Sequence, residues 1–295
     1  MTKEKKVRLK KDLKKFTLDC LNGGNINIKY KKSTHYKEIS VREERIIYQA
    51  KAKVPTLQDI LELTIKKIEK EFPNIIKIDY IKNHFSACAS QLEKIAFSIY
   101  LKFEEKMFIS AIDQWIFENK ELLEKLSKKY INPSAFAKEV CRKFYPMIQK
   151  MEFESSQKRK ARGGKTFEYI IKYLLTKIGI ECQRPEKKAR KTLKRVDLVV
   201  PNQDIAMTRP DQAYFLSCKR TLRERWKQTI PERKPSWRVF LLTLDDSLSE
   251  GKANEINVLG MIVYLKDELK EEKHLKNKGW VRKLSELPID LGMKK

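Results

Sequence analysis

RVDLVV at residues 195–200 and YFLSCKRTLRERW at residues 214–226 decide the fold and the chemistry expected of this chain. Each stretch contains a short apolar run, which predicts a strand. One charged residue accompanies each run: Asp197 lies within the first, and Lys219 ends the second. Two neighbouring strands that place these residues at the same end would set Asp197 beside Lys219. Phosphodiester hydrolysis needs at least a carboxylate that binds a divalent metal and, next to it, a lysine that acts on the attacking water.

Each residue of this pair also has a simpler interpretation when it is taken alone. Asp197 could cap a turn or pair with Arg195 at the end of a strand. Lys219 could be a surface lysine whose aliphatic stem packs on apolar residues. The pair favours a site, because a carboxylate within an apolar strand needs a partner or a metal.

A second carboxylate is absent from its usual place, two residues before the lysine, where this chain has Ser217. Glu232 follows a predicted helix from Thr221 to about Ile230 that could return its carboxylate to the strand ends. Glu168, on the helix before the strands, could approach from the opposite side. For both glutamates the alternative is a solvated surface position.

The wider pattern predicts an α/β fold. Helical spacing of apolar residues dominates residues 55–150, so 1–154 is expected to form a mainly helical N-terminal domain. The basic, glycine-containing stretch 155–165 is the predicted linker, followed by a helix from Thr166 to Ile178 that ends at Gly179. Residues 155–295 are then expected to form a mixed sheet flanked by helices. The other predicted strands are Ile180–Cys182, Val239–Thr243 and Gly260–Leu265.

Charge and composition restrict the class of partner. The 295 residues carry 65 Lys and Arg against 39 Asp and Glu, a formal net charge of +26 that attracts polyanions such as nucleic acid. No apolar run approaches the length of a membrane span. The five cysteines contain no CxxC pair, and the N-terminus has no secretory pattern. A cytoplasmic protein without a membrane partner is therefore expected.

Basic residues on both sides of the strands suggest how nucleic acid would be bound. Arg223-Glu224-Arg225 could read two consecutive G·C pairs, because guanine offers two acceptors to arginine and cytosine offers a donor to a carboxylate. A solvated charge run is the alternative. The run from Lys158 to Lys165 is expected to contact DNA phosphates. Gly163-Gly164-Lys165-Thr166 lacks the first glycine and the preceding strand of a P-loop, so no nucleotide cofactor is expected.

The spaced elements together resemble the catalytic core of type II restriction endonucleases in the PD-(D/E)XK superfamily. They resemble most closely the branch that cuts CCGG and CCNGG sites, which includes the EcoRII catalytic domain. That branch has a serine in place of the common acid, a displaced glutamate and an R-(D/E)-R motif. The matching elements are Asp197, Ser217-x-Lys219, Arg223-Glu224-Arg225, Glu232 and, on the preceding helix, Gly164–Glu168. The chain departs from the pattern at Val196, where a proline is usual.

The resemblance implies Mg²⁺-dependent cleavage of double-stranded DNA at a palindromic CCGG or CCNGG site, leaving 5′ overhangs, in a prokaryotic cytoplasm. Asp197 and Glu232 would bind the metal, Lys219 would orient or deprotonate the attacking water, and Glu168 would support the metal. A palindrome also implies a homodimer or higher homo-oligomer, with the N-terminal domain contacting DNA or forming the dimer. Expected DNA-backbone contacts are Lys158, Arg159, Lys160, Arg162, Lys165 and Ser217.

Two other functions compete with this hypothesis. A non-catalytic nucleic-acid-binding protein would account for the charge alone, and it predicts salt-sensitive binding without any Mg²⁺-dependent product. A structure-specific nuclease of the same fold would act on branched DNA or RNA. The arginine–glutamate–arginine triplet argues against the latter, because recognition of shape needs no groups that read bases.

Overall fold

The computed structural model describes residues 39–186, 189, 192–193, 196–222 and 237–293. Contacts divide the chain into two compact units: unit 1 is Met1–Val54 with Glu104–Ser156, and unit 2 is Pro55–Phe103 with Gln157–Lys295. Among the described residues, the helices are α2 (Val41–Ala52), α3 (Leu57–Glu71), α4 (Ile78–Asn83), α5 (Phe85–Glu118), α6 (Lys120–Lys129), α7 (Pro133–Lys177), α8 (Gln203–Thr208), α9 (Glu250–Val258), α10 (Asp267–Lys270) and α11 (Leu287–Asp290). The strands are β1 (Leu198–Val200), β2 (Tyr214–Lys219), β3 (Arg238–Thr243), β4 (Ile262–Leu265) and β5 (Val281–Lys283).

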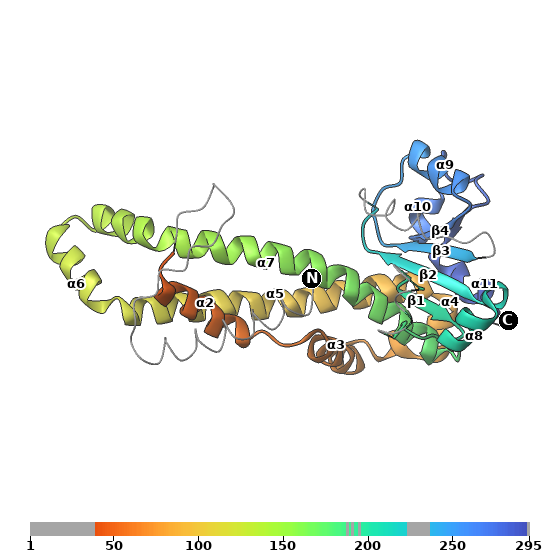
Figure 1. The fold of residues 1–295 in the computed structure, drawn as a ribbon, viewed down its shortest axis with the longest axis horizontal. Coiled ribbons are helices and arrows are strands. Elements are labelled where there is room, and N and C mark those ends of the chain that lie inside the picture. The colour runs from red at the N-terminus through yellow and green to blue at the C-terminus, as the bar shows by residue number, and fades with distance from the viewer. Residues whose placement is uncertain (1–38, 187–188, 190–191, 194–195, 223–236, 294–295) are drawn as a thin grey trace. The chain divides into compact units, whose positions relative to one another are not determined.

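The described part of unit 1 is helical, as the apolar spacing predicts. Helix α2 begins with a capping box, in which the Ser40 hydroxyl accepts from the Glu43 backbone and the Glu43 carboxylate accepts from the Ser40 backbone. It packs with the parts of α5 and α7 that belong to this unit (Figure 1). The buried residues that form this core are Ile46, Ile47, Ala50, Met107, Ala111, Trp115, Met147 and Met151. No helix in the described ranges is long and apolar enough to cross a membrane.

Local sequence signals fix the helix ends in unit 2. Thr56 caps α3 in a capping box with Asp59. Gly179, with φ of 87°, ends α7, since this left-handed conformation costs glycine little. The backbone N–H groups of Gly179 and Ile180 donate to the carbonyls of Thr176 and Leu175, at 3.1 and 2.9 Å, in a Schellman motif.

The sheet in unit 2 is mixed, with strand order β1-β2-β3-β4-β5. β1 is antiparallel to β2, whereas β2, β3, β4 and β5 run parallel to one another. This arrangement confirms the predicted mixed α/β sheet flanked by helices. Because β1 reverses direction, the start of β1 and the end of β2 lie at the same edge of the sheet.

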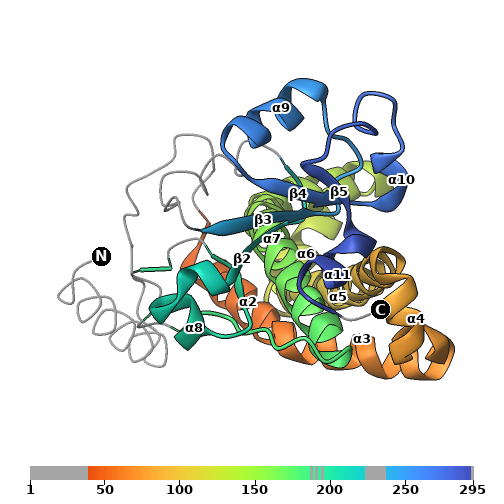
Figure 2. The same ribbon diagram turned by 90° about the vertical axis from the view of Figure 1, so that its right-hand side faces the viewer.

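Both faces of the sheet are buried, and alternate residues along each strand point to opposite faces. One face packs on α5 and the end of α7, and the other packs on α9 (Figure 2). Strand residues on the first face include Leu198, Leu216, Cys218, Phe240, Leu242 and Tyr264. Those on the second face include Val199, Phe215, Val239, Leu241, Val263 and Leu265. The strands therefore read as continuous apolar runs in the sequence.

The predicted linker at residues 155–165 is wrong, because these residues lie inside helix α7. Lysine, arginine and alanine are good helix formers, and they outweigh the roughly 1 kcal/mol that each helical glycine costs relative to alanine. The compact units also differ from the linear division at residue 155, since Pro55–Phe103 belongs with the sheet. Burial of apolar residues of α4 and α5 in the core beneath β2 and β3 accounts for that difference.

Two predictions about strands also need correction. Residues 180–182 do not form a strand; instead, Gln183 makes an isolated bridge to Val199. Strand β5 was not predicted, because its three residues contain a single buried apolar side chain, Val281. Most of the helix predicted over residues 221–230 lies outside the described residues.

Candidate active site

The antiparallel register of β1 and β2 brings the acid and the lysine together. Leu198 pairs with Leu216, so Asp197, just before β1, lies across from the residues that end β2. The Asp197 backbone N–H donates to the Leu216 carbonyl at 3.0 Å and extends this pairing. Lys219 Nζ lies 2.7 Å from Asp197 Oδ2. The structure thus confirms that the two side chains converge at one edge of the sheet.

Asp197 is held by two donors at one oxygen. Its Oδ2 accepts from Lys219 Nζ and, at 2.8 Å, from the backbone N–H of Cys218. Both side chains of the pair are largely buried, with exposed fractions of 16% for Asp197 and 22% for Lys219. A charge-assisted bond in such surroundings fixes both the carboxylate and the ammonium group in place.

Glu168 on α7 is the second acid near this edge. It is buried because Phe167, Ile170 and Ile171 on the same helix pack into the core beneath the sheet. Burial raises the pKa of Glu168 to about 7, and the nearby carboxylate of Asp197 also raises it. The positive charges of Arg184, Lys219 and Lys165 act in the opposite direction on this pKa. A carboxyl group with a pKa shifted by burial and by a specific partner is typical of functional sites.

Arg184 is a partner of Glu168 that sequence reasoning missed. Its Nη2 lies 3.2 Å from Glu168 Oε2, and its Nη1 donates to the Tyr169 hydroxyl at 3.2 Å. The sequence offers no periodic or motif signal for this pairing, because Arg184 stands in an irregular segment after α7.

Four of the predicted site residues, Glu232 and the triplet Arg223-Glu224-Arg225, lie outside the described residues, so their roles stay predictions. Within the described ranges, no group of three or more His, Cys, Asp or Glu side chains is arranged to hold a metal. Among the described residues, Asp197 and Glu168 are therefore two acids near one another and do not form a complete set of metal ligands.

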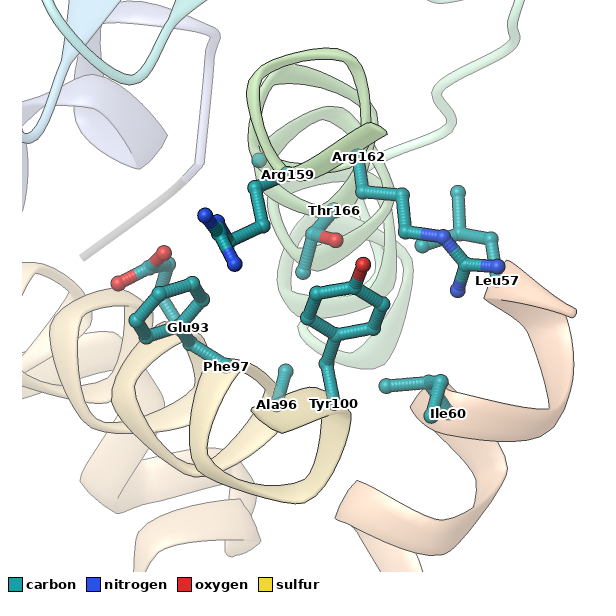
Figure 3. A pocket seen from close by; sticks show the side chains of 10 residues that line it. Leu57, Ile60, Glu93, Ala96, Phe97, Tyr100, Arg159, Arg162 and Thr166 are labelled. Carbon is teal, nitrogen blue, oxygen red and sulfur yellow. The ribbon is translucent and has the colours of Figure 1, made fainter. Parts of the chain in front are cut away.

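The predicted contacts with DNA phosphates divide into two groups. Lys158, Lys160 and Lys165 are exposed along α7, and Arg159 is half-buried. Arg162 instead donates to the Pro55 carbonyl at 2.9 Å, and its guanidinium lies 4.9 Å from the Tyr100 ring centre (Figure 3).

Two of these predictions therefore need correction. The guanidinium of Arg162 is engaged inside unit 2, where its Nη1 is shielded from solvent. Ser217 is only 1% exposed, so neither side chain is presented to a DNA backbone in this structure. Ser217 lies on a strand of the buried sheet, whereas Arg162 is half-buried and contacts Pro55 and Tyr100. The spacing of residues in the sequence does not predict these contacts.

Cys218 is a packed thiol. Its side chain is 2% exposed, and burial raises the pKa of the thiol well above its ordinary value. A thiol held in this neutral form is a poor nucleophile. Cys218 is therefore poorly suited to act as a nucleophile in this structure.

This fold is that of restriction endonucleases. The structure of metal-depleted Ecl18kI with uncleaved, modified DNA matches with a TM-score of 0.71 at 23% identity, over 85% of this chain and 82% of that chain. The PspGI–substrate DNA complex matches with a TM-score of 0.56 at 19% identity, over 82% of this chain and 93% of that chain. Both comparisons show a similar fold over most of this chain.

The chain belongs to the EcoRII C-terminal family, whose model matches residues 117–287. The type II restriction enzyme SsoII of Shigella sonnei is 27% identical over 208 residues, which are 68% of this chain. The match spans 66% of the length of SsoII, just under two thirds. Family membership thus confirms the resemblance that the spaced motif predicts.

Proposed function

We propose that this chain is a type II restriction endonuclease that hydrolyses both strands of DNA at a specific site. One observation carries the proposal: Lys219 Nζ lies 2.7 Å from Asp197 Oδ2 at the edge of the sheet. Membership in the EcoRII C-terminal family and the net charge of +26 support it. Similar structures are DNA complexes, which favours DNA over other polyanions.

A divalent metal, Mg²⁺ in our proposal, fits the donor chemistry at this edge. Magnesium is usually held by one or two carboxylates together with phosphate oxygens of the substrate. Asp197 and Glu168 supply two carboxylates, and we propose Glu232 as a third ligand. When bound, the ion would stabilise negative charge on the phosphate and favour the hydroxide form of a water.

The side chains of the chain itself would prepare the reaction. Asp197 Oδ2 holds the Lys219 ammonium at the edge of the sheet, where it can orient a water and offset charge on a phosphate. Glu168, with a pKa of about 7, can hold a proton on its carboxyl group near neutral pH and release it above that pH. Burial of both carboxylates strengthens these electrostatic effects.

Sequence recognition is assigned to the triplet Arg223-Glu224-Arg225, which we propose reads the C·G pairs of a CCGG or CCNGG core. The two arginines would donate to guanine N7 and O6, and the glutamate would accept from a cytosine amino group. Exposed lysines of α7, Lys158, Lys160 and Lys165, would bind phosphates. A palindromic site calls for a homodimer or a higher oligomer, and cleavage before the first C would leave 5′ overhangs.

Digestion of a DNA of known sequence tests the proposal. Purified protein is incubated with the DNA in Mg²⁺ or in EDTA, and the ends are mapped by sequencing. We expect discrete cuts with 5′ extensions around CCGG or CCNGG cores in Mg²⁺, and none in EDTA. Salt-sensitive binding without any Mg²⁺-dependent product would instead identify a non-catalytic binding protein. Cuts that follow branches or junctions, regardless of sequence, would identify a structure-specific nuclease.

A further inference from the structure

Arg220 follows the end of β2 and contacts two helices of unit 2, with its side chain 39% exposed. Its Nε lies 2.6 Å from Glu93 Oε1, and its Nη2 donates to Glu93 Oε2 at 3.5 Å. The guanidinium also lies 5.3 Å from the centre of the Phe97 ring on the same helix, α5. Glu93 is only 7% exposed, so its carboxylate is committed to partners within the fold. In Figure 3 it points from α5 toward Arg159 of α7.

Helix α7 approaches the same side chain at Gly163. A Cβ added at Gly163 would lie 3.3 Å from Arg220 Cδ, closer than side chains normally pack. A Cβ added at the next residue, Gly164, would meet nothing within 4 Å. Glycine in a helix interior costs about 1 kcal/mol relative to alanine. At Gly163 the missing side chain leaves room for Arg220. At Gly164 the missing side chain makes room for no neighbour within 4 Å.

The backbone after Lys219 is held by the end of the neighbouring strand β3. The Thr243 hydroxyl donates to the Arg220 carbonyl at 3.4 Å. Asp245 Oδ2 accepts from the Leu222 backbone N–H at 2.7 Å. The Leu222 side chain is completely buried. Both the side chain and the backbone of the segment that follows Lys219 are therefore anchored.

We propose that Arg220 and Glu93 are positioning residues for the reaction: their ion pair, seated against Gly163, fixes the strand end from which Lys219 reaches Asp197. This inference rests on the proposed function, because it assigns a role within that site. Lys219 is adjacent to Arg220, so the ion pair with Glu93 adds a side-chain anchor to the backbone contacts that hold this strand end. A misplacement of 1 Å in an active site costs on the order of 10²-fold in rate.

The first test replaces Glu93 with alanine and with glutamine in the full chain. The rate constant for cleavage is measured with protein in excess over a duplex that carries the mapped site, and DNA affinity is measured separately in EDTA. We expect Glu93→Ala to slow cleavage about tenfold or more, with affinity within about twofold of the wild type. Glu93→Gln should recover much of the rate, because its amide oxygen can still accept from Arg220 Nε.

Gly163→Ala and Gly164→Ala form a matched pair that keeps the test decisive if Glu93→Ala does not fold. Each change adds one methyl group, and each raises the helix propensity of its position by the same amount. Gly163→Ala should slow cleavage severalfold, because the added Cβ displaces Arg220 Cδ by a few tenths of an ångström, whereas Gly164→Ala should slow it less.

Three outcomes would overturn the inference. Glu93→Ala could cleave at the wild-type rate, or lose affinity and rate together. If that variant does not fold, equal rates for the two glycine variants would overturn it. A wild-type protein that makes no Mg²⁺-dependent cut would refute the proposed function first, and the positioning role would fall with it. The two failures are therefore distinguishable.

Discussion

Replacement of Glu168 by glutamine tests the electrostatics of the buried edge of the sheet. The ordinary pKa of this carboxyl is 4.5, and burial beside Asp197 raises it to about 7. One pKa unit corresponds to 1.36 kcal/mol, so the shift amounts to about 3 kcal/mol at high pH. The side chain of Glu168 is 11% exposed, so solvent screens this effect little.

The sign of the effect follows from proton binding. The folded protein binds the Glu168 proton more tightly than the unfolded chain does, so stability falls as pH rises from about 4.5 to about 7. Glutamine carries no charge at any pH, so the Glu168→Gln variant does not lose this stability as the pH rises. The free energy of unfolding of Glu168→Gln should therefore equal that of the wild type near pH 4.5. It should exceed the wild-type value by up to about 3 kcal/mol near pH 8.

Urea denaturation of both proteins in EDTA, at several pH values from 4.5 to 8.5, measures this difference. The Glu62→Gln variant, which removes an exposed carboxylate, is the control. A Glu168→Gln difference that is flat across the same range would refute the assigned burial and the proximity of Asp197.

Three further predictions concern metal, recognition and salt. At pH 8, Mg²⁺ at ten times its dissociation constant should stabilise the wild type by about 1.4 kcal/mol in urea titrations. Glu168→Gln should gain less, and equal gains would remove Glu168 from the metal site. Arg223→Ala should lose about 1–3 kcal/mol of discrimination for each lost bidentate contact, measured as relative cleavage of cognate and altered sites. Lys160→Ala should lower the salt slope of DNA binding by about 1 at unchanged site preference; an unchanged slope would exclude a phosphate contact.

The parts of the fold that depend on local signals could be predicted from the sequence. Thr56 caps α3 and Gly179 ends α7, because a side-chain oxygen and a positive φ act within one helical turn. The convergence of Asp197 and Lys219 was also predictable, since both lie at the ends of short apolar strands. One charged residue at each strand end restricts the register to a few arrangements.

Features that depend on tertiary packing could not be predicted. The pKa of Glu168 requires knowledge of what covers α7, and the pairing of Arg220 with Glu93 joins residues 127 positions apart. Residues 155–165 were misread as a linker because their charge and glycines hide a helix. In each case the deciding contact comes from an element distant in the sequence.

The cleavage rate of Lys219→Ala on the mapped site tests the central claim most directly. In EDTA the variant should bind that duplex about as tightly as the wild type does, because Lys219 lies at the cleavage edge of the sheet and the base-reading triplet is unchanged. In Mg²⁺ it should leave the duplex uncut under conditions in which the wild type cuts to completion. Cleavage by Lys219→Ala at the wild-type rate would contradict the claim that the Asp197–Lys219 pair performs the reaction.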